Sequence, residues 1–285
     1  MILAGDIGGT KTTLALFATN PALRGFEREP AVVESFESRA FSSFEEVLQK
    51  FLARHQPRLL AGCIGIAGPV RRNRCEATNL PWSVDGAELA RLASLSAFHL
   101  LNDLEAVGFG LDLLRPDEVV ELQAGESGAS GHRAVIAAGT GLGEAGLFWD
   151  GTGHRPFATE GGHADFAPRD DREWALLRFL RKEHERVSWE RVISGPGLVN
   201  LYRFVLATNA DEKGCEPPES EVDVQAEDAA AVISHRAQSG ESPLCGEALD
   251  LFVRLYGAEA GNLALKTLST GGLYIGGGIA PKILD

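Results

Sequence analysis

The sequence lacks the features of a membrane-spanning or secreted protein. No stretch of its 285 residues approaches the ~20 consecutive apolar residues that a membrane helix needs. Residues 1–6 show neither the basic start nor the apolar stretch of a signal peptide. Cysteine is scarce and forms no C-x-x-C pair, so we expect reduced thiols and a cytoplasmic location. The four cysteines are Cys63, Cys75, Cys215 and Cys245.

Positive charge is also scarce. Lysine and arginine together number 27 against 40 aspartates and glutamates, which gives a formal net charge of −13. Such a surface repels the phosphates of nucleic acids and of anionic membranes, so we expect neither as a partner. A nucleotide ligand would have to be held by local groups. The content of 44% hydrophobic and 24% charged residues is typical of a globular enzyme.

The apolar pattern predicts an α/β protein with two lobes. In the first half we expect strands at 2–7, 12–18, 32–41, 59–67 and 97–101 and helices at 44–52, 85–92 and 104–114. In the second half we expect strands at 133–138, 145–149 and 273–275 and helices at 170–180, 196–206 and 246–268. The order strand, glycine turn, strand occurs in both halves. We therefore predict a small lobe over 1–110 and a large lobe over 111–285.

The first glycine turn, GDIGGTKT at 5–12, is not a P-loop, because position 10 is threonine and a strand follows. Backbone N–H groups of Gly8 and Gly9 and the hydroxyl of Thr10 are still suited to phosphate, and Asp6 to Mg²⁺ through water. The alternative is an ordinary hairpin turn in which Asp6 caps its own backbone. The polar run of Thr10, Lys11 and Thr12 favours phosphate binding.

Two further glycine turns follow in the second half. Gly141, Gly143 and Gly146 satisfy the spacing G-x-G-x-x-G, but a strand follows them where a dinucleotide site needs a helix. We therefore predict a second phosphate-facing turn at Gly139–Gly141, with Thr140 as a hydroxyl donor. Gly276–Gly278 would let a flat group approach the backbone, and the alternative there is a flexible strand end.

Polar side chains near the expected strand ends are candidates for chemistry. Asn102 and Asp103 end a strand before an apolar helix, where Asp103 is either a helix cap or a base for a hydroxyl proton. Glu160 and His163 surround a glycine pair, and Glu190 precedes a sharp turn, although all three would also suit a solvated surface. Ala67-Gly68 after a buried strand forms either one wall of a cleft or a simple turn.

Taken in order, these segments resemble the bacterial glucokinase family within the superfamily of sugar kinases, actin and heat-shock-protein ATPases. The matching stretches are GDIGGTKT (5–12), GIAGP (65–69), TNLPW (78–82), LLNDLEAV (100–107), GTGLG (139–143), TEGGHADFAP (159–168), ERVISGPGLVNLY (190–202) and GGLYIGGGIAPK (271–282). The resemblance implies a two-lobed actin-like ATPase (ribonuclease H-like) fold with a cleft between the lobes. It also implies ATP-dependent phosphorylation of glucose, with Mg²⁺, and a homodimer.

The resemblance also assigns roles to residues. The first two glycine turns would bind the phosphates of ATP, and Gly276, Gly277 and Gly278 would lie against adenosine. Asn102, Asp103, Glu160, His163 and Glu190 would bind the hydroxyls of glucose. Asp103 would be the base at the 6-hydroxyl.

Two features depart from the family pattern. Glu144 follows GTGLG in place of a small apolar residue, and we expect it to point outward because a carboxylate there would repel phosphate. The sequence ends at Asp285, before the terminal helix expected from the family.

Three rival functions remain open. One is a kinase for another hexose or an N-acetylated amino sugar, although no C-x-C-G zinc cluster follows His163. Another is a sugar-responsive transcription factor, which the acidic charge and the lack of a preceding helix-turn-helix disfavour. The third is a catalytically silent sugar sensor.

Overall fold

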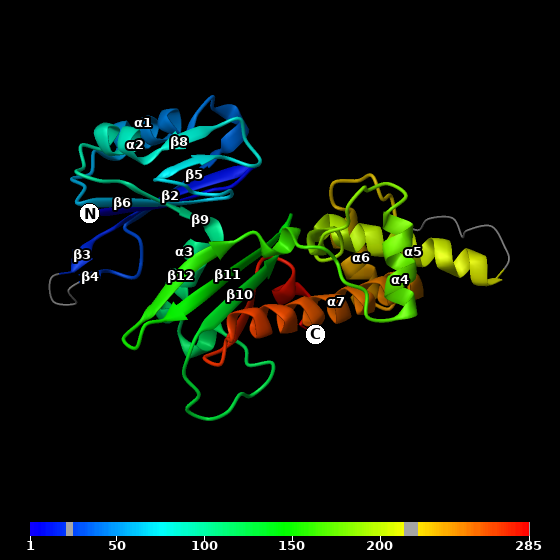
Figure 1. The fold of residues 1–285 in the computed structure, drawn as a ribbon. Helices are drawn as coiled ribbons and strands as arrows, with labels where there is room; N and C mark the ends of the chain where they lie inside the picture. Colours follow the sequence, from blue (N-terminus) through cyan, green and yellow to red (C-terminus); the bar gives the residue numbers. More distant parts are fainter. Residues whose placement is uncertain (21–24, 214–221, 285) are drawn as a thin grey trace. The chain divides into compact units, whose positions relative to one another are not determined.

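The computed structural model describes residues 1–20, 25–213 and 222–284. Its chain forms two compact units, Met1–Leu114 (unit 1) and Arg115–Asp285 (unit 2) (Figure 1). Each unit has its own apolar core and its own main sheet. The predicted boundary after residue 110 falls at the end of α3 (Asp103–Gly110) inside unit 1. That the units act as two lobes which close on a ligand stays a prediction.

Unit 1 is built on a five-stranded mixed sheet in the order β5-β2-β1-β6-β9. Its strands are β1 (Ile2–Ile7), β2 (Lys11–Phe17), β5 (Val32–Glu37), β6 (Ala61–Ile66) and β9 (His99–Asn102). β1 and β2 form an antiparallel hairpin, and β6 and β9 run parallel to β1. Two short pairs complete the unit, β3 (Thr19–Asn20) with β4 (Gly25–Phe26) and β7 (Arg74–Glu76) with β8 (Ser83–Asp85).

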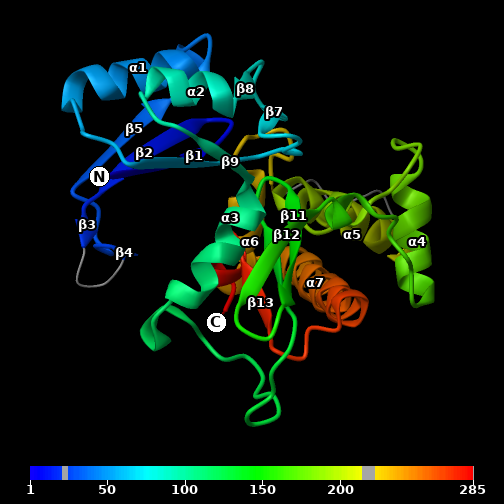
Figure 2. The same ribbon diagram turned by 60° about the vertical axis from the view of Figure 1, so that its left-hand side comes forward.

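Two capped helices, α1 (Phe44–His55) and α2 (Gly86–Leu92), lie beside each other over one face of this sheet (Figures 1 and 2). The side chain of Asp85 accepts from the N–H of Ala87 at 2.8 Å, as a helix cap should. At α1 the hydroxyl of Ser43 accepts from the N–H of Glu46, but the Glu46 carboxylate accepts in return from Ser42, one residue earlier than a capping box predicts.

Unit 2 contains a four-stranded mixed sheet in the order β12-β11-β10-β13. Its strands are β10 (Arg133–Ala138), β11 (Leu142–Trp149), β12 (His154–Thr159) and β13 (Leu273–Gly276). β10 and β11 form an antiparallel hairpin, and β13 runs parallel to β10. The helices are α4 (Asp171–Leu180), α5 (Gly195–Lys213), α6 (Ala229–Gln238) and α7 (Pro243–Thr267). The long helix α7 packs along the sheet against β10 and β13 (Figure 2).

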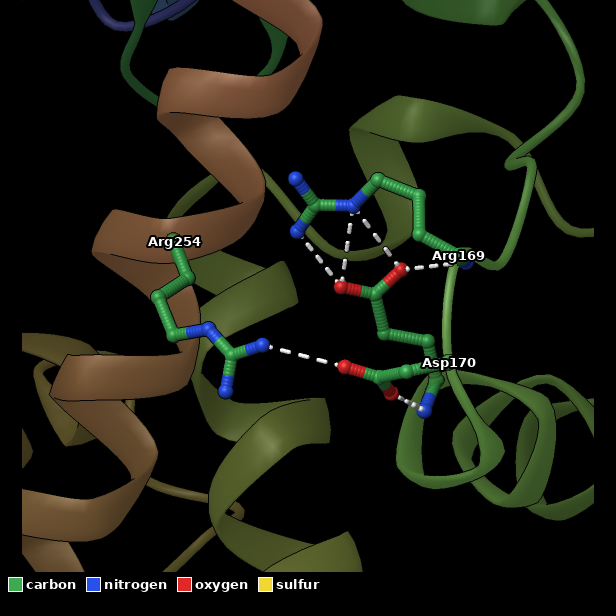
Figure 3. Close-up of polar contacts among 4 residues, drawn as sticks. Arg169, Asp170 and Arg254 are labelled. Atoms are coloured by element: carbon green, nitrogen blue, oxygen red, sulfur yellow. Dashed lines mark hydrogen bonds and ion pairs between the residues drawn. The ribbon is translucent and has the colours of Figure 1, made fainter.

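Ion pairs at the start of α4 attach it to α7 (Figure 3). Asp170 caps α4 by accepting from the N–H of Glu173 at 2.9 Å, and its other oxygen accepts from Arg254 of α7 at 3.0 Å. Arg169 donates to the buried carboxylate of Glu173 at 2.6 Å. Because Glu173 is 1% exposed, this partner supplies the charge that a buried carboxylate needs.

The predicted α/β class and the repeat of strand, glycine turn and strand are confirmed. The strand predicted at 32–41 ends at Glu37, and the helix predicted at 104–114 ends at Gly110. β12 was missed because Pro156 interrupts its pattern, and proline is tolerated there because β12 is an edge strand.

Two expected absences concern the described residues alone. Within 1–20, 25–213 and 222–284, no helix combines the length and the apolar composition needed to cross a bilayer. Of the cysteines in those ranges, Cys63 and Cys75 are free thiols.

Candidate active site

The parallel strands of unit 1 bring its predicted site residues to one edge of the sheet. The register pairs Asp6 of β1 with Gly65 of β6, and Ile66 of β6 with Asn102 of β9. Because these strands are parallel, their carboxyl ends meet at the same edge. This edge carries the set that we call half-site 1, namely Asp6, the turn Gly8–Lys11, Ala67, Gly68, Asn102 and Asp103.

The first glycine turn is supported from beneath by two hydroxyls. Thr12 is fully buried, and its hydroxyl lies 2.9 Å from that of Ser38. Ser38 in turn donates to the carbonyl oxygen of Gly8 at 2.8 Å. Thr10 and Lys11 are exposed, whereas Thr12 points into the core, which suits a supporting role better than direct contact with a phosphate. Ser38 was missed because a lone serine at a strand end carries no motif.

Asn102, rather than Asp103, caps helix α3. Its Oδ1 accepts from the N–H groups of Leu104 and Glu105 at 3.0 and 3.3 Å, and its Nδ2 donates to the carbonyl oxygen of Gly68 at 3.2 Å. The cap therefore joins the end of β9 to the turn after β6. Asp103 occupies the first helical position, so its carboxylate is not required as the cap.

Burial raises the pKa of Asp103 above its ordinary value, although hydrogen bonds from the backbone of Leu104 and Asp103 and from Asn102 oppose that shift. A carboxylate that holds its charge less readily than usual accepts a proton more readily. Asp103 thus has the chemistry of a general base.

Asp6 has the charge environment of a cation site. Burial raises its pKa, and the negative charge of Asp103 raises it further. A divalent cation near these two carboxylates would relieve that repulsion. Mg²⁺ usually takes one or two carboxylates and completes its shell with water and phosphate. Asp6 therefore fits Mg²⁺, although the described residues contain no group of three or more metal-ligating side chains.

In unit 2 the second glycine turn is closed by backbone bonds and by a carboxylate. The N–H of Gly139 donates to the carbonyl oxygen of Gly141 at 2.9 Å, and the carbonyl oxygen of Gly139 accepts from Gly195 at 2.8 Å. Glu190 accepts from the N–H of Leu142 at 3.0 Å. A Cβ added at Gly141 would lie 2.5 Å from Oε2 of Glu190, so the side chain of Glu190 would have to shift to accommodate any other residue there. Thr140, at the tip of the turn, is exposed.

The third glycine turn lies beside the second, because Gly276 of β13 pairs with Ala137 of β10. Gly277 has φ +83°, and a Cβ there would lie 2.3 Å from the carbonyl oxygen of Ala138. The buried hydroxyl of Tyr256 in α7 accepts from the N–H of Ala138 at 3.0 Å and lies 3.3 Å from the carbonyl oxygen of Gly276. Tyr256 thus holds both strand ends in place, a role that its apolar helix did not reveal.

Three polar side chains gather beside the second turn. Nε2 of His163 lies 3.8 Å from Oε2 of Glu160, and Nδ1 lies 3.9 Å from Oε1 of Glu190. His163, Glu160 and Glu190 are 57%, 60% and 31% exposed, so they can reach a ligand from solvent. With the turns Gly139–Gly141 and Gly276–Gly278 they form what we call half-site 2. Each unit therefore brings its own predicted residues together.

The expectation that Glu144 points outward is wrong. Glu144 is 1% exposed, and its Oε2 lies 1.9 Å from the position that a Cβ added to Gly161 would occupy. Glu144 therefore lies inside unit 2, under the loop that carries Glu160 and His163. The sequence could not reveal this, because the loop that covers Glu144 follows fifteen residues later in the chain.

Comparisons with known proteins identify the family of the chain. The family model described as Glucokinase matches residues 3–285. A glucokinase from Synechocystis sp. is 40% identical over 99% of this chain and 84% of its own length. The chain belongs to the glucokinase family. A crystal structure of glucokinase from an Antarctic psychrotroph has a TM-score of 0.81 at 32% identity and covers 99% of this chain and 85% of its own.

A more distant match supports the fold alone. A ROK-family glucokinase from Streptomyces griseus, solved with glucose and AMPPNP, has a TM-score of 0.61 at 19% identity and covers 100% of this chain and 86% of its own. The fold of this family member is therefore the actin-like ATPase fold that glucokinases share with ROK proteins.

Proposed function

We propose that this member of the glucokinase family transfers the γ-phosphoryl group of ATP to the 6-hydroxyl of glucose, with Asp103 as the general base. The observation that carries the proposal is the state of Asp103, which shares the N–H of Leu104 with the helix cap Asn102 and whose pKa is raised by burial. The match to the Glucokinase family model and the 40% identity to a glucokinase from Synechocystis sp. support this reaction.

In this proposal Asp103 accepts the proton of the 6-hydroxyl as that oxygen attacks the γ-phosphorus. The bond from the γ-phosphorus to the bridging oxygen of ADP breaks, and the products are glucose 6-phosphate and ADP. Phosphoryl transfer has a loose transition state, so the protein contributes mainly by orienting the alcohol and by placing positive charge and N–H donors near the phosphates.

The glycine turns would supply the backbone donors. In half-site 1 these would be Gly9 and the exposed Thr10 and Lys11, because the N–H of Gly8 already donates to the carbonyl oxygen of Lys11 at 3.1 Å. In half-site 2 they would be Thr140 and Gly141, because the N–H of Gly139 already donates to the carbonyl oxygen of Gly141. The predicted direct contacts of Gly8 and Gly139 with phosphate are therefore not available through these N–H groups. Gly276–Gly278 would lie against adenosine, where a side chain would block close approach. Mg²⁺ bound at Asp6 would neutralise charge on the phosphates. A supporting role for Thr12 beneath the turn replaces direct contact with phosphate.

Each unit offers groups that suit the hydroxyls of a sugar. Asn102 and Asp103 of unit 1 and Glu160, His163 and Glu190 of unit 2 offer acceptors and donors for adjacent hydroxyls. An epimer would leave one of these polar groups without a partner, and such a loss discriminates strongly between substrates. A homodimer and a cytoplasmic location are further parts of the proposal that rest on the family.

The proposal is tested by replacing Asp103 with asparagine, which keeps the size of the side chain and removes the base. We expect kcat for glucose to fall by ~10²–10⁴, the range for a lost general base. Because burial raises the pKa of Asp103, this base becomes protonated at a higher pH than an ordinary aspartate does. As the pH is lowered, the wild-type rate should therefore begin to fall at that higher pH, and the D103N rate should lack this decline.

The matched control is E105Q, which removes a carboxylate from the same helix, two residues away. It should retain the rate within a few-fold. A D103N rate within a few-fold of wild type would refute the assignment of the base. Parallel assays with mannose, fructose and N-acetylglucosamine separate glucose from the other sugars. Binding of glucose without product formation in wild type would favour a sugar sensor.

A further inference from the structure

The loop 77–82 joins β7 to β8 and carries the sequence TNLPW. Its two ends are tied together, because the N–H of Ala77 donates to the carbonyl oxygen of Trp82 at 2.8 Å. Trp82 is 2% exposed, and its indole N–H donates to the carbonyl oxygen of Phe41 at 3.3 Å. Leu80 is also buried. The loop is therefore anchored in the core of unit 1 and holds its tip in a fixed place.

The tip of this loop lies against two parts of half-site 1. The N–H of Thr78 donates to the carbonyl oxygen of Ala67 at 3.2 Å, and a Cβ added at Gly68 would lie 3.0 Å from Oγ1 of Thr78. The next residue, Asn79, lies over the first glycine turn, because a Cβ added at Gly9 would lie 2.8 Å from Cβ of Asn79. Two successive loop residues thus join the turn after β6 to the turn after β1.

The packing of Asn79 explains why residue 9 is glycine. Gly9 does not have a positive φ, so its backbone conformation would suit other residues. What excludes them is space. The atom that an added side chain would meet is Cβ of Asn79, which is fixed to the loop backbone and cannot turn aside as the end of a long side chain can. The first glycine turn is therefore shaped to accept Asn79.

The carboxamide of Asn79 is available to a ligand. Asn79 is exposed, and in the part of the chain that the structure describes its carboxamide has no hydrogen-bond partner. Nδ2 is the amide atom nearer Gly9, 3.8 Å from the position of the added Cβ. It carries two N–H donors and no charge, so it suits a phosphate oxygen, which the carboxylates of Asp6 and Asp103 would repel.

The first glycine turn also lacks one of its backbone donors. The N–H of Gly8 is occupied by the carbonyl oxygen of Lys11 at 3.1 Å. A side-chain donor placed over Gly9 would replace that missing N–H group. Phosphate oxygens accept several hydrogen bonds at once, and bonds to such a charged acceptor are stronger than bonds between neutral groups.

The position of the loop favours the γ-phosphate over the other two. Gly68, beside Thr78, accepts from Nδ2 of Asn102 at 3.2 Å, and Asn102 directly precedes the proposed base Asp103. In an in-line transfer the alcohol at the base attacks the γ-phosphorus. The γ-phosphate is therefore the part of ATP that would lie nearest this side of half-site 1.

We propose that Asn79 binds the phosphoryl group that is transferred, with Nδ2 donating a hydrogen bond to an oxygen of the γ-phosphate. Negative charge on these oxygens persists through the loose transition state, and a donor that is already in place stabilises it. Thr78 is a positioning residue, since its bond to Ala67 keeps the loop tip beside Gly9. The inference rests on the proposed function, which supplies ATP as the donor.

The experiment compares wild type with N79A, N79D and S83A. N79A removes the carboxamide, and N79D keeps its size but replaces the donor by a negative charge. S83A is the matched control, because Ser83 belongs to the same hairpin and its exposed hydroxyl donates to Glu76 at 2.8 Å. Steady-state rates with glucose and Mg²⁺-ATP are measured together with the Kd values of ADP, of the ATP analogue AMPPNP and of glucose. Thermal unfolding shows whether each variant is folded.

The two nucleotides separate a contact with the γ-phosphate from a structural role, because ADP has no γ-phosphate. We expect N79A to raise the Kd of AMPPNP about tenfold, as for loss of one hydrogen bond to a charged group. The Kd values of ADP and of glucose should stay those of wild type. We expect kcat of N79A to fall by ~10², as for loss of one preorganised donor. N79D should lose more than N79A, because its carboxylate repels phosphate, and S83A should match wild type.

Equal weakening of AMPPNP and ADP in N79A, or an unchanged kcat, would overturn the inference and leave the glucokinase reaction intact. Weaker glucose binding at unchanged AMPPNP affinity would also overturn it, and would assign Asn79 to the sugar. Folded wild type that binds AMPPNP but forms no glucose 6-phosphate would overturn the proposed function. The ratio of the two nucleotide Kd values would still decide whether Asn79 contacts the γ-phosphate.

Discussion

The hairpins that open the two sheets use the same topology for different purposes. When the paired residues of each hairpin are counted outward from its turn, Asp6 corresponds to Ala137, and Leu14 corresponds to Glu144. Unit 1 therefore has a carboxylate at the strand end and a fully buried leucine on the facing strand. Unit 2 has alanine at the strand end and a buried carboxylate on the facing strand. In unit 1 the negative charge lies at the edge of the sheet, whereas in unit 2 it lies in the interior, beneath the loop that carries Glu160 and His163.

The supports of the two glycine turns differ in the same way. In unit 1 the neutral hydroxyls of Thr12 and Ser38 hold the turn from beneath. In unit 2 the carboxylate of Glu190 accepts from the backbone just after the turn. The comparison leads us to predict that negative charge serves a cation and a base in unit 1, whereas in unit 2 the carboxylate of Glu190 positions the backbone.

The largest effect expected from this comparison concerns Asp6. D6N removes the carboxylate at the end of β1, and the corresponding residue of the other hairpin, Ala137, has none. We expect kcat/KM for ATP with Mg²⁺ to fall by ~10², as for loss of one charge-stabilising group. More Mg²⁺ should be needed for half-maximal rate. The control is D150N, an exposed aspartate at the far end of β11. Equal rates for D6N and wild type would show that the carboxylate at the end of β1 has no role in the reaction.

A smaller effect is expected at the glycine that follows the parallel strand of each unit. Gly68 after β6 and Gly277 after β13 both have positive φ, +133° and +83°. G277A forces alanine into a left-handed conformation and against Ala138, which should cost about 1–3 kcal/mol of stability and raise KM for ATP.

G278A is the matched control for G277A, because a Cβ there meets nothing within 4 Å. Urea unfolding measures both variants. If G277A and G278A were equally stable, the backbone conformation at residue 277 would not be what requires glycine.

The smallest effect is expected beneath the first turn. T12V removes one hydroxyl of the buried Thr12–Ser38 pair and should cost about 1 kcal/mol of unfolding free energy, together with a modest rise in KM for ATP. T13V removes an exposed hydroxyl that lies 3.1 Å from Ser35 and should stay within about 0.5 kcal/mol. An unchanged KM in a destabilised T12V would limit the pair to a structural role.

Local sequence predicted most elements because their signals depend on near neighbours. Strand β10 and helices α2 and α4 have ends that the alternation of apolar residues and the caps Asp85 and Asp170 predict closely. The glycine turns were also foreseen, since glycine tolerates backbone conformations that other residues avoid. The edge strand β12 was not predicted, because proline normally interrupts a strand. Pro156 is tolerated because β12 has a neighbouring strand on one side only, and the sequence does not show that.

The sequence by itself determined the α/β class, the repeated hairpin and glycine turn, and which polar residues follow which strands. Only the tertiary structure decided that Asn102 joins the helix start to Gly68, that Tyr256 binds the backbone of β10, and that Glu144 is buried beneath Gly161. These contacts join residues up to 118 positions apart, and the pKa of a carboxyl depends on burial and on charges that such distant segments bring to it.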